Sequence, residues 1–153
     1  MPPRRLKSNF LAAFLIVSLA IVLQLKIGLI SGLYPNFALA VLIALAFFLD
    51  FSELGFLVIF GALILNWRPG LSPEILVLIS LPIIVYIFRK FLPAQAWLNF
   101  TLALVLGFLV FYSAAGFQSL VKNFNLFFID LIISTVFAVL AFLILKNFYA
   151  PKV

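Results

Sequence analysis

Two short apolar segments in tandem, Phe37–Leu49 and Leu54–Leu65, constrain the fold of this chain more than any other feature. They contain 13 and 12 residues and are joined by only four. Helices of this length, rising about 1.5 Å per residue, would cover about 20 Å, whereas the hydrocarbon core of a membrane is about 30 Å thick. So tight a connection makes the two helices antiparallel neighbours. They span a membrane only if flanking residues extend the two segments to Ser31–Asp50 and Glu53–Ser72, which have 20 residues each.

A re-entrant hairpin is the alternative arrangement for this pair. The hairpin would enter and leave from the outer side, and Asp50 and Glu53 would then lie in lipid or in a wet cavity. If the pair spans the membrane, both acids lie at its surface. There they either cap helix ends, because an acid near a helix N-terminus opposes its positive dipole, or contact a cytoplasmic partner.

Composition indicates that lipid is the solvent of this chain. Of its 153 residues, 67% are hydrophobic and 9% are charged, whereas a soluble domain has about 45–50% apolar and about 25% charged residues. The polar surface is too small to cover a soluble body of this size. We therefore expect an all-α, polytopic integral membrane helix bundle of about six short transmembrane helices, forming a single transmembrane domain over residues 1–153.

Missing residue types exclude several kinds of site. The chain has no cysteine and no histidine, which removes thiolate catalysis, the usual zinc ligands and the usual general base. It offers no nucleophile–base set and no phosphate loop. We predict no catalytic residue, no metal and no cofactor. The net charge of the chain is +6, and its basic residues are scattered at the ends of apolar runs. This pattern predicts that the chain contacts membrane lipid rather than nucleic acid.

The remaining helices are predicted from apolar runs and their end signals. The runs are Phe10–Leu25 (read as an uncleaved first helix), Ile75–Phe88, Pro93 to about Tyr112, and about Leu126–Phe148. Ser72 is suited to cap the fourth helix, and residues 116–125 are expected to form a polar connection.

Four residues are predicted to shape helix packing. Pro35 suits the first turn of the second helix, where its missing N–H costs nothing. Gly55 and Gly61 permit close approach of a neighbouring helix. Pro82 lies inside the fourth helix and should kink it.

Polar residues near helix ends are the candidate contacts with a partner or ligand. They are Asn36, Asp50, Glu53, Asn66, Arg68, Arg89, Lys90 and Asp130. Asn36 is placed to hydrogen-bond local backbone, and Arg89 and Lys90 suit the negative end of their own helix. Asp130 is the only acid clearly inside an apolar run. An acid inside a membrane is a functional candidate by default, and the alternative is a structural acid with its hydrogen bonds satisfied.

The distribution of basic residues predicts the orientation. With six helices and both termini inside, seven basic residues lie inside: Arg4, Arg5, Lys7, Arg89, Lys90, Lys146 and Lys152. Three lie outside: Lys26, Arg68 and Lys122. The excess of Lys and Arg inside supports cytoplasmic termini.

The order of these features resembles the MreD family, the small membrane subunit of the bacterial rod-shape (elongation) system. The resemblance covers most of the chain. It is carried by a basic start, a first helix ending in Leu23-Gln24, and Pro35-Asn36 opening the second helix. A third helix containing Gly61–Leu65 follows, and Arg89–Leu92 precedes the fifth. Where the family often has an aspartate after the glycine-led run, this chain has Asn66.

This resemblance implies a multi-pass protein of the bacterial inner membrane. It implies a non-enzymatic scaffold that contacts an MreC-like protein and other members of the cell-wall elongation complex. A different class is kept as the alternative, because six short helices also resemble the substrate-binding S component of energy-coupling-factor vitamin transporters. In that case Asn66, Gln118, Asn123 and Asp130 would converge on an outer cavity. A scaffold instead predicts a filled bundle and an exposed apolar patch.

Overall fold

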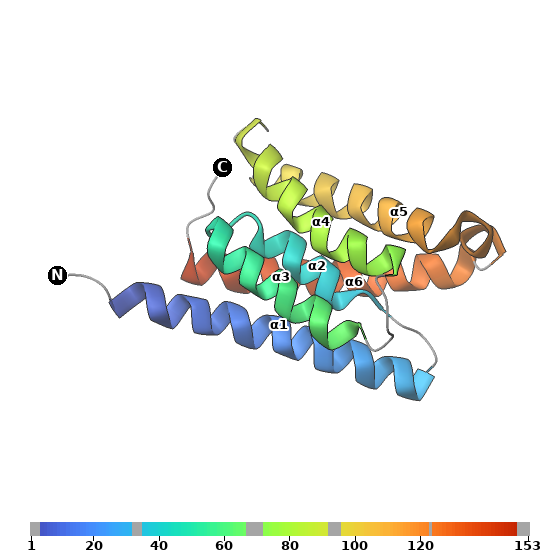
Figure 1. Ribbon diagram of the computed structural model, residues 1–153, viewed down its shortest axis with the longest axis horizontal. Coiled ribbons are helices and arrows are strands. Elements are labelled where there is room, and N and C mark those ends of the chain that lie inside the picture. Colours follow the sequence, from blue (N-terminus) through green and yellow to red (C-terminus); the bar gives the residue numbers. More distant parts are fainter. Residues whose placement is uncertain (1–3, 32–34, 67–71, 92–95, 123, 150–153) are drawn as a thin grey trace.

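The computed structural model describes residues 4–31, 35–66, 72–91, 96–122 and 124–149 (Figure 1). Within these ranges the chain is helical and contains no strand, as the sequence predicts. The helices are α1 (Arg4–Ser31), α2 (Phe37–Leu45), α3 (Phe51–Leu65), α4 (Pro73–Phe88), the 3₁₀ helix η1 (Arg89–Phe91), α5 (Ala96–Lys122) and α6 (Phe124–Phe148).

A single short helix, α2, lies at the centre of the bundle (Figure 1). It contacts each of the five other α-helices. Those five also contact one another in the closed order α1, α3, α4, α5, α6 and back to α1. The fold is therefore a ring of five helices around a sixth.

The sequence of α2 suits this central place because it has no polar side. A helix that is hydrophobic all round is buried on every face, and each residue from Phe37 to Leu49 is at most 3% exposed. Small residues such as Ala38, Ala40 and Ala44 let the surrounding helices approach its backbone closely. The helix ends at Leu45 and the chain continues in turns to Leu49, so the predicted helix Phe37–Leu49 is shorter than expected.

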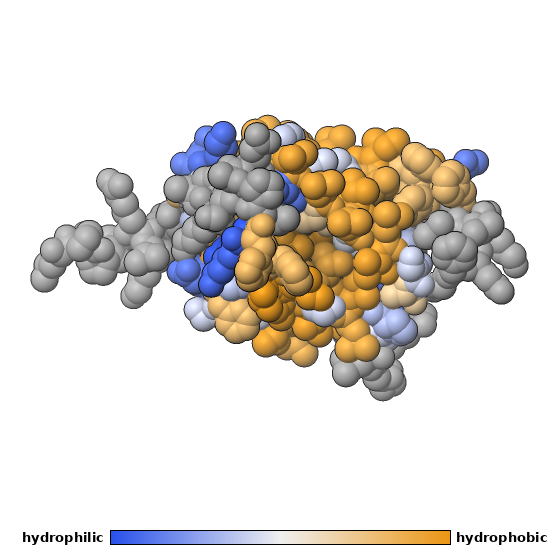
Figure 2. Space-filling view, turned by 90° about the horizontal axis from the view of Figure 1, so that it is seen from above, coloured by the Kyte–Doolittle hydropathy of each residue, from blue (hydrophilic) through white to orange (hydrophobic). Residues whose placement is uncertain are grey.

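Three helices of the ring are long and apolar enough to cross a membrane. The qualifying stretches are Phe10–Ile30 in α1, Trp97–Ala114 in α5 and Phe127–Phe148 in α6. On the face that Figure 2 shows, apolar residues cover the middle, while most hydrophilic ones lie toward the two ends. An outside of this kind is stable in lipid and not in water, so the protein is built to lie in a membrane.

Helix boundaries differ from the predicted ones mainly at the connections. Residues 116–122, expected in a polar loop, continue α5, and α6 begins directly afterwards at Phe124. Polar side chains do not stop a helix: Gln, Lys and Leu are good helix formers, and only Gly116 in this stretch opposes one. The first helix likewise continues through Gly28 to Ser31.

The fourth helix begins as predicted and is not broken by its proline. The Ser72 hydroxyl oxygen accepts a hydrogen bond from the backbone N–H of Ile75 at 3.4 Å, which caps α4. The helix is continuous through Pro82, which is buried. The kink expected at Pro82 stays a prediction.

Three glycines differ sharply in the space beside them, and this predicts the effect of substitution. A Cβ atom on Gly107 of α5 would lie 2.8 Å from Ile43 and 2.9 Å from Leu81, whereas beside Gly61 the nearest atoms are at 3.8 and 3.9 Å. Beside Gly55 there is open space within 4 Å. We expect the Gly107→Ala protein to be less stable than the Gly55→Ala protein by about 1–3 kcal/mol, because overpacking forces the terminal methyl groups of Ile43 and Leu81 to shift, while the gain in helix propensity is similar at both positions.

The matched substitutions at the other two glycines supply the controls. Gly55→Ala should leave stability unchanged or raise it by up to about 1 kcal/mol, because alanine is the better helix former. Gly61→Ala should be tolerated at its ordinary contact distances. Unfolding in mixed detergent micelles measures all three, and a Gly107→Ala protein as stable as Gly55→Ala would contradict the close packing of α5 on α2.

Candidate functional site

Asp130 of α6 and Asn36, just before α2, form the centre of a buried polar group that we call the N-end cluster. The Asp130 carboxylate accepts hydrogen bonds from the Asn36 backbone N–H at 3.0 Å and from the Asn36 side-chain amide at 3.2 Å. The Ser134 hydroxyl donates to it at 2.8 Å, one helical turn further along α6. The Asn36 amide also donates to the Tyr112 hydroxyl at 3.4 Å. Helices α2, α5 and α6 are joined here.

The three donors explain how an acid is accommodated in this position. A carboxylate that only accepts hydrogen bonds is in the pattern of the ionised form. Asp130 faces the N-terminus of α2, which carries roughly half a positive charge. Asn36, predicted to bond local backbone, is instead the link between that helix end and α6. Of the two hypotheses for Asp130, this geometry favours the structural acid.

Gln24 of α1 also caps the start of α2. Its side-chain oxygen accepts a hydrogen bond from the backbone N–H of Ala38 at 3.1 Å. The first N–H groups of a helix have no partner within the helix itself, and in α2 two of them are satisfied from α1 and α6. Side chains remote in sequence therefore do the work of a local cap.

Arg89 performs the corresponding task at the other end of α2. Its guanidinium donates to the carbonyl oxygens of Ala46 at 2.6 Å and Leu49 at 3.1 Å, and it stacks 4.0 Å from the centre of the Tyr86 ring. Arg89 is 5% exposed. Arg89 directly follows its own helix, as predicted from the sequence, but its side-chain hydrogen bonds go to carbonyls that follow α2, where a cation is also favourable.

Burial has a cost that the neighbours of Arg89 partly offset. Desolvation lowers the pKa of the guanidinium from its usual value, while Tyr86 and Asp50 act in the opposite direction. Arginine remains protonated in proteins even so. The acid at one end of α2 and the base at the other both match the helix dipole.

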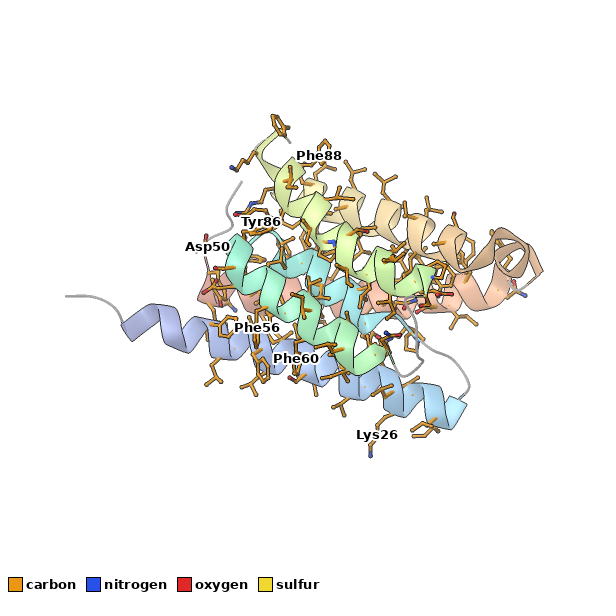
Figure 3. The ribbon with its side chains drawn as sticks, viewed as in Figure 1. Lys26, Asp50, Phe56, Phe60, Tyr86 and Phe88 are labelled. Atoms are coloured by element: carbon orange, nitrogen blue, oxygen red, sulfur yellow. The ribbon has the colours of Figure 1, made fainter. Side chains whose placement is uncertain are left out.

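The remaining candidates at the Arg89 end lie at the surface. Asp50 and Lys90 are exposed and Glu53 is half-buried. Asp50 and Glu53 form a capping box at the start of α3, in which the Asp50 N–H donates to the Glu53 carboxylate at 3.4 Å. Figure 3 shows Asp50 at the turn before α3, at one end of the bundle. The capping interpretation therefore describes these acids, and their surface position leaves them accessible to a partner.

A cavity of about 490 Å³ lies beside the N-end cluster. Its polar lining residues are Gln24, Asn36, Asn66, Ser72 and Glu74. Apolar residues such as Leu65, Leu78 and Phe111 form the rest of the wall. The volume falls in the range of about 300–1,000 Å³ that is typical of small-molecule sites.

Only some of the predicted convergence is present in this region. Asn66 lines the cavity, and Asp130 is hydrogen-bonded to Asn36, which also lines it. Arg68, Asn123 and the side chain of Gln118 lie outside the described residues. Gln24, Ser72 and Glu74 were not predicted from the sequence as lining residues. The pairing of Ser134 with Asp130 could have been predicted, because a spacing of four residues places two side chains on one helix face.

Of the predicted packing residues, Pro35 is buried directly before Asn36. A Cβ atom added at Gly61 would lie at ordinary van der Waals distance from Leu42 of α2 and Ile21 of α1, whereas one added at Gly55 would meet open space.

Comparisons of the chain with models of known protein families, with curated proteins and with solved structures found no match. The family resemblance and the function therefore enter as proposals, supported by the residues and geometry described above.

Proposed function

We propose that this protein is a non-enzymatic scaffold subunit of the bacterial rod-shape and cell-wall elongation machinery. It lies in the inner membrane, crosses it six times with both termini in the cytoplasm, and acts through helix contacts with an MreC-like partner. The observation that carries the proposal is the arrangement of α2: a helix fills the centre of the ring. Its end groups are bonded to residues of the same chain. Other proteins then bind to the outer surface of the bundle.

The proposed orientation is supported by the placement of the helix ends. The start of α1, the Asp50 turn and the end of α4 lie at the same end of the bundle, as does the end of α6 (Figures 1 and 3). Of the basic residues predicted to be cytoplasmic, Arg4, Arg5 and Lys7 belong to the start of α1, Arg89 and Lys90 follow α4, and Lys146 lies in the last turn of α6, while Lys152 lies outside the described residues. Reporter fusions at the two termini test the orientation, and reporters on opposite sides would refute it.

Gly55 offers a specific probe of partner contact. In the interior of a helix, glycine costs about 1 kcal/mol relative to alanine. The open space beside Gly55 shows that the described part of the chain does not use its small size. In membranes, glycine lets a second helix approach closely. We expect Gly55→Ile to leave the purified protein as stable as wild type and to reduce recovery of wall-elongation proteins several-fold in a crosslinking pull-down.

The pull-down has a matched control and a clear failing result. Ile59 lies one turn further along α3 and is already exposed and large, so Ile59→Leu should preserve recovery. Equal recovery with Gly55→Ile and with wild type would remove this surface from the interface. Absence of wall-elongation proteins from the wild-type sample would refute the proposed function itself.

A second candidate function, a substrate-binding S-component-like subunit of a vitamin transporter, is favoured by the cavity of about 490 Å³ at the N-end cluster. Recovery of a pair of ATPases in the same crosslinking experiment would select it over the scaffold.

A further inference from the structure

Among the described residues, the cavity beside the N-end cluster is lined by the helices α1, α3, α4 and α5, and by Asn36 and Ser72, which directly precede α2 and α4. Its described lining contains both polar and apolar groups. Leu65, Leu78 and Phe111 are among the apolar ones, and Asn36, Ser72 and Glu74 lie where α2 and α4 begin. A site of this kind suits a molecule with one polar end and an apolar body.

Existing hydrogen bonds determine which lining groups are still available. The Gln24 oxygen is taken by the Ala38 N–H, and the Asn36 amide nitrogen is taken by Asp130 and Tyr112. The Asn36 side-chain oxygen is left as an acceptor, since no hydrogen bond among the described residues uses it. Glu74 is likewise without an ion pair or hydrogen bond within the described chain, and the Ser72 oxygen keeps a second lone pair.

Glu74 is the one charged side chain in the described lining of the cavity. The basic residue Lys26 is exposed on α1 and points away from the bundle (Figure 3). The carboxylate of Glu74 favours a cation as its partner.

We propose that this cavity binds a molecule carrying a primary ammonium group on a small apolar body, with Glu74 as counter-ion. An ammonium group has three N–H donors, and Glu74, Asn36 Oδ1 and Ser72 Oγ are the matching acceptors. A quaternary ammonium fits less well, because such groups are typically held by a cage of aromatic faces, and Phe111 is the one aromatic residue of the described lining. The ammonium group belongs either to a free amine or to the ethanolamine head of a lipid.

This inference does not rest on the scaffold role, and it supplies the ligand class that the second candidate function would need. Binding is measured on the full-length protein purified in detergent, so its failure is separate from that of the pull-down. The free probe is hexylammonium chloride, and 1-hexanol is its uncharged counterpart. We expect hexylammonium to bind at least ten-fold more tightly than hexanol, and Glu74→Gln to remove that preference.

Two further variants keep the test decisive. Glu53→Gln makes the same chemical change at the opposite end of the bundle, where glutamine can still accept the capping bond, and it should bind hexylammonium as wild type does. Leu65→Trp places a large side chain in the apolar wall and should weaken binding of both probes. The unfolding midpoint of each variant without ligand identifies any that fail to fold.

Phosphatidylethanolamine and phosphatidylcholine in mixed micelles distinguish the two sources of the ammonium group. Displacement of hexylammonium by phosphatidylethanolamine but not by phosphatidylcholine identifies the lipid head as the ligand. Hexylammonium binding without such displacement identifies a free amine. Equal affinity for hexanol and hexylammonium, unchanged binding in Glu74→Gln, or no binding of either ammonium compound would overturn the proposal.

Discussion

Replacing Arg89 with methionine is expected to lower the free energy of unfolding by about 3 kcal/mol, because two buried carbonyls lose a charged hydrogen-bond donor. Those carbonyls belong to Ala46 and Leu49, at distances of 2.6 and 3.1 Å from the guanidinium. Methionine keeps much of the side-chain volume, so the loss reports the hydrogen bonds and the charge rather than a cavity. Reversible unfolding in mixed micelles, followed by circular dichroism, measures the change.

Lys90 supplies the matched control for this experiment. It is the adjacent residue, carries the same charge and is exposed. Lys90→Met should change the free energy of unfolding by less than about 0.5 kcal/mol, as is usual for surface substitutions. Equal effects at the two positions would show that Arg89 acts through general charge, and the assignment of its capping role would be wrong.

Replacing Asp130 with leucine is expected to cost about 4 kcal/mol, since it leaves several buried donors without an acceptor and removes the charge that opposes the α2 dipole. The donors concerned are the two N–H groups of Asn36 and the hydroxyl of Ser134. Membrane insertion should be intact, because leucine is more apolar than aspartate. The free energy of unfolding in mixed micelles is again the measurement.

A smaller change at the same cluster calibrates this result. Ser134→Ala removes one of the three hydrogen bonds to Asp130 and should cost about 1 kcal/mol. If Asp130→Leu instead leaves stability unchanged and abolishes recovery of partner proteins or binding of the ammonium probe, then Asp130 serves a partner or ligand. The structural interpretation of this acid would then be wrong.

Much of the architecture follows from local sequence signals. The apolar runs and the start chemistry at Ser72 locate the helices, since these are short-range features that do not depend on neighbours. The Asp50–Glu53 pair likewise predicts the start of a helix. Two of the misplaced boundaries, after Leu25 and at residues 116–122, lie where helices continue past the apolar run, whereas α2 ends at Leu45, inside its apolar run. An apolar run does not report where the helix ends.

The central place of α2 could not be derived in the same way. In lipid, an apolar side chain is equally suited to a neighbouring helix and to the acyl chains, so the composition of Phe37–Leu49 does not separate the two. The partners of its ends were hidden for a related reason. Asn36 and Asp130 are 94 positions apart, and nothing in the sequence near either residue indicates that the two form a hydrogen bond.

The separation between α2 and its partners also has a consequence for biosynthesis. Arg89 is made 43 residues after Ala46, and Asp130 appears 94 residues after Asn36. A nascent chain that has emerged only as far as α3 therefore holds a short helix with Gln24 at its N-terminus but without Asp130, and with its last carbonyls still lacking Arg89; unpaired backbone groups are costly in hydrocarbon. Assembly of this protein must wait for α6. Ribosomal products that stop before Asp130 would be substrates for membrane proteases rather than partly working subunits.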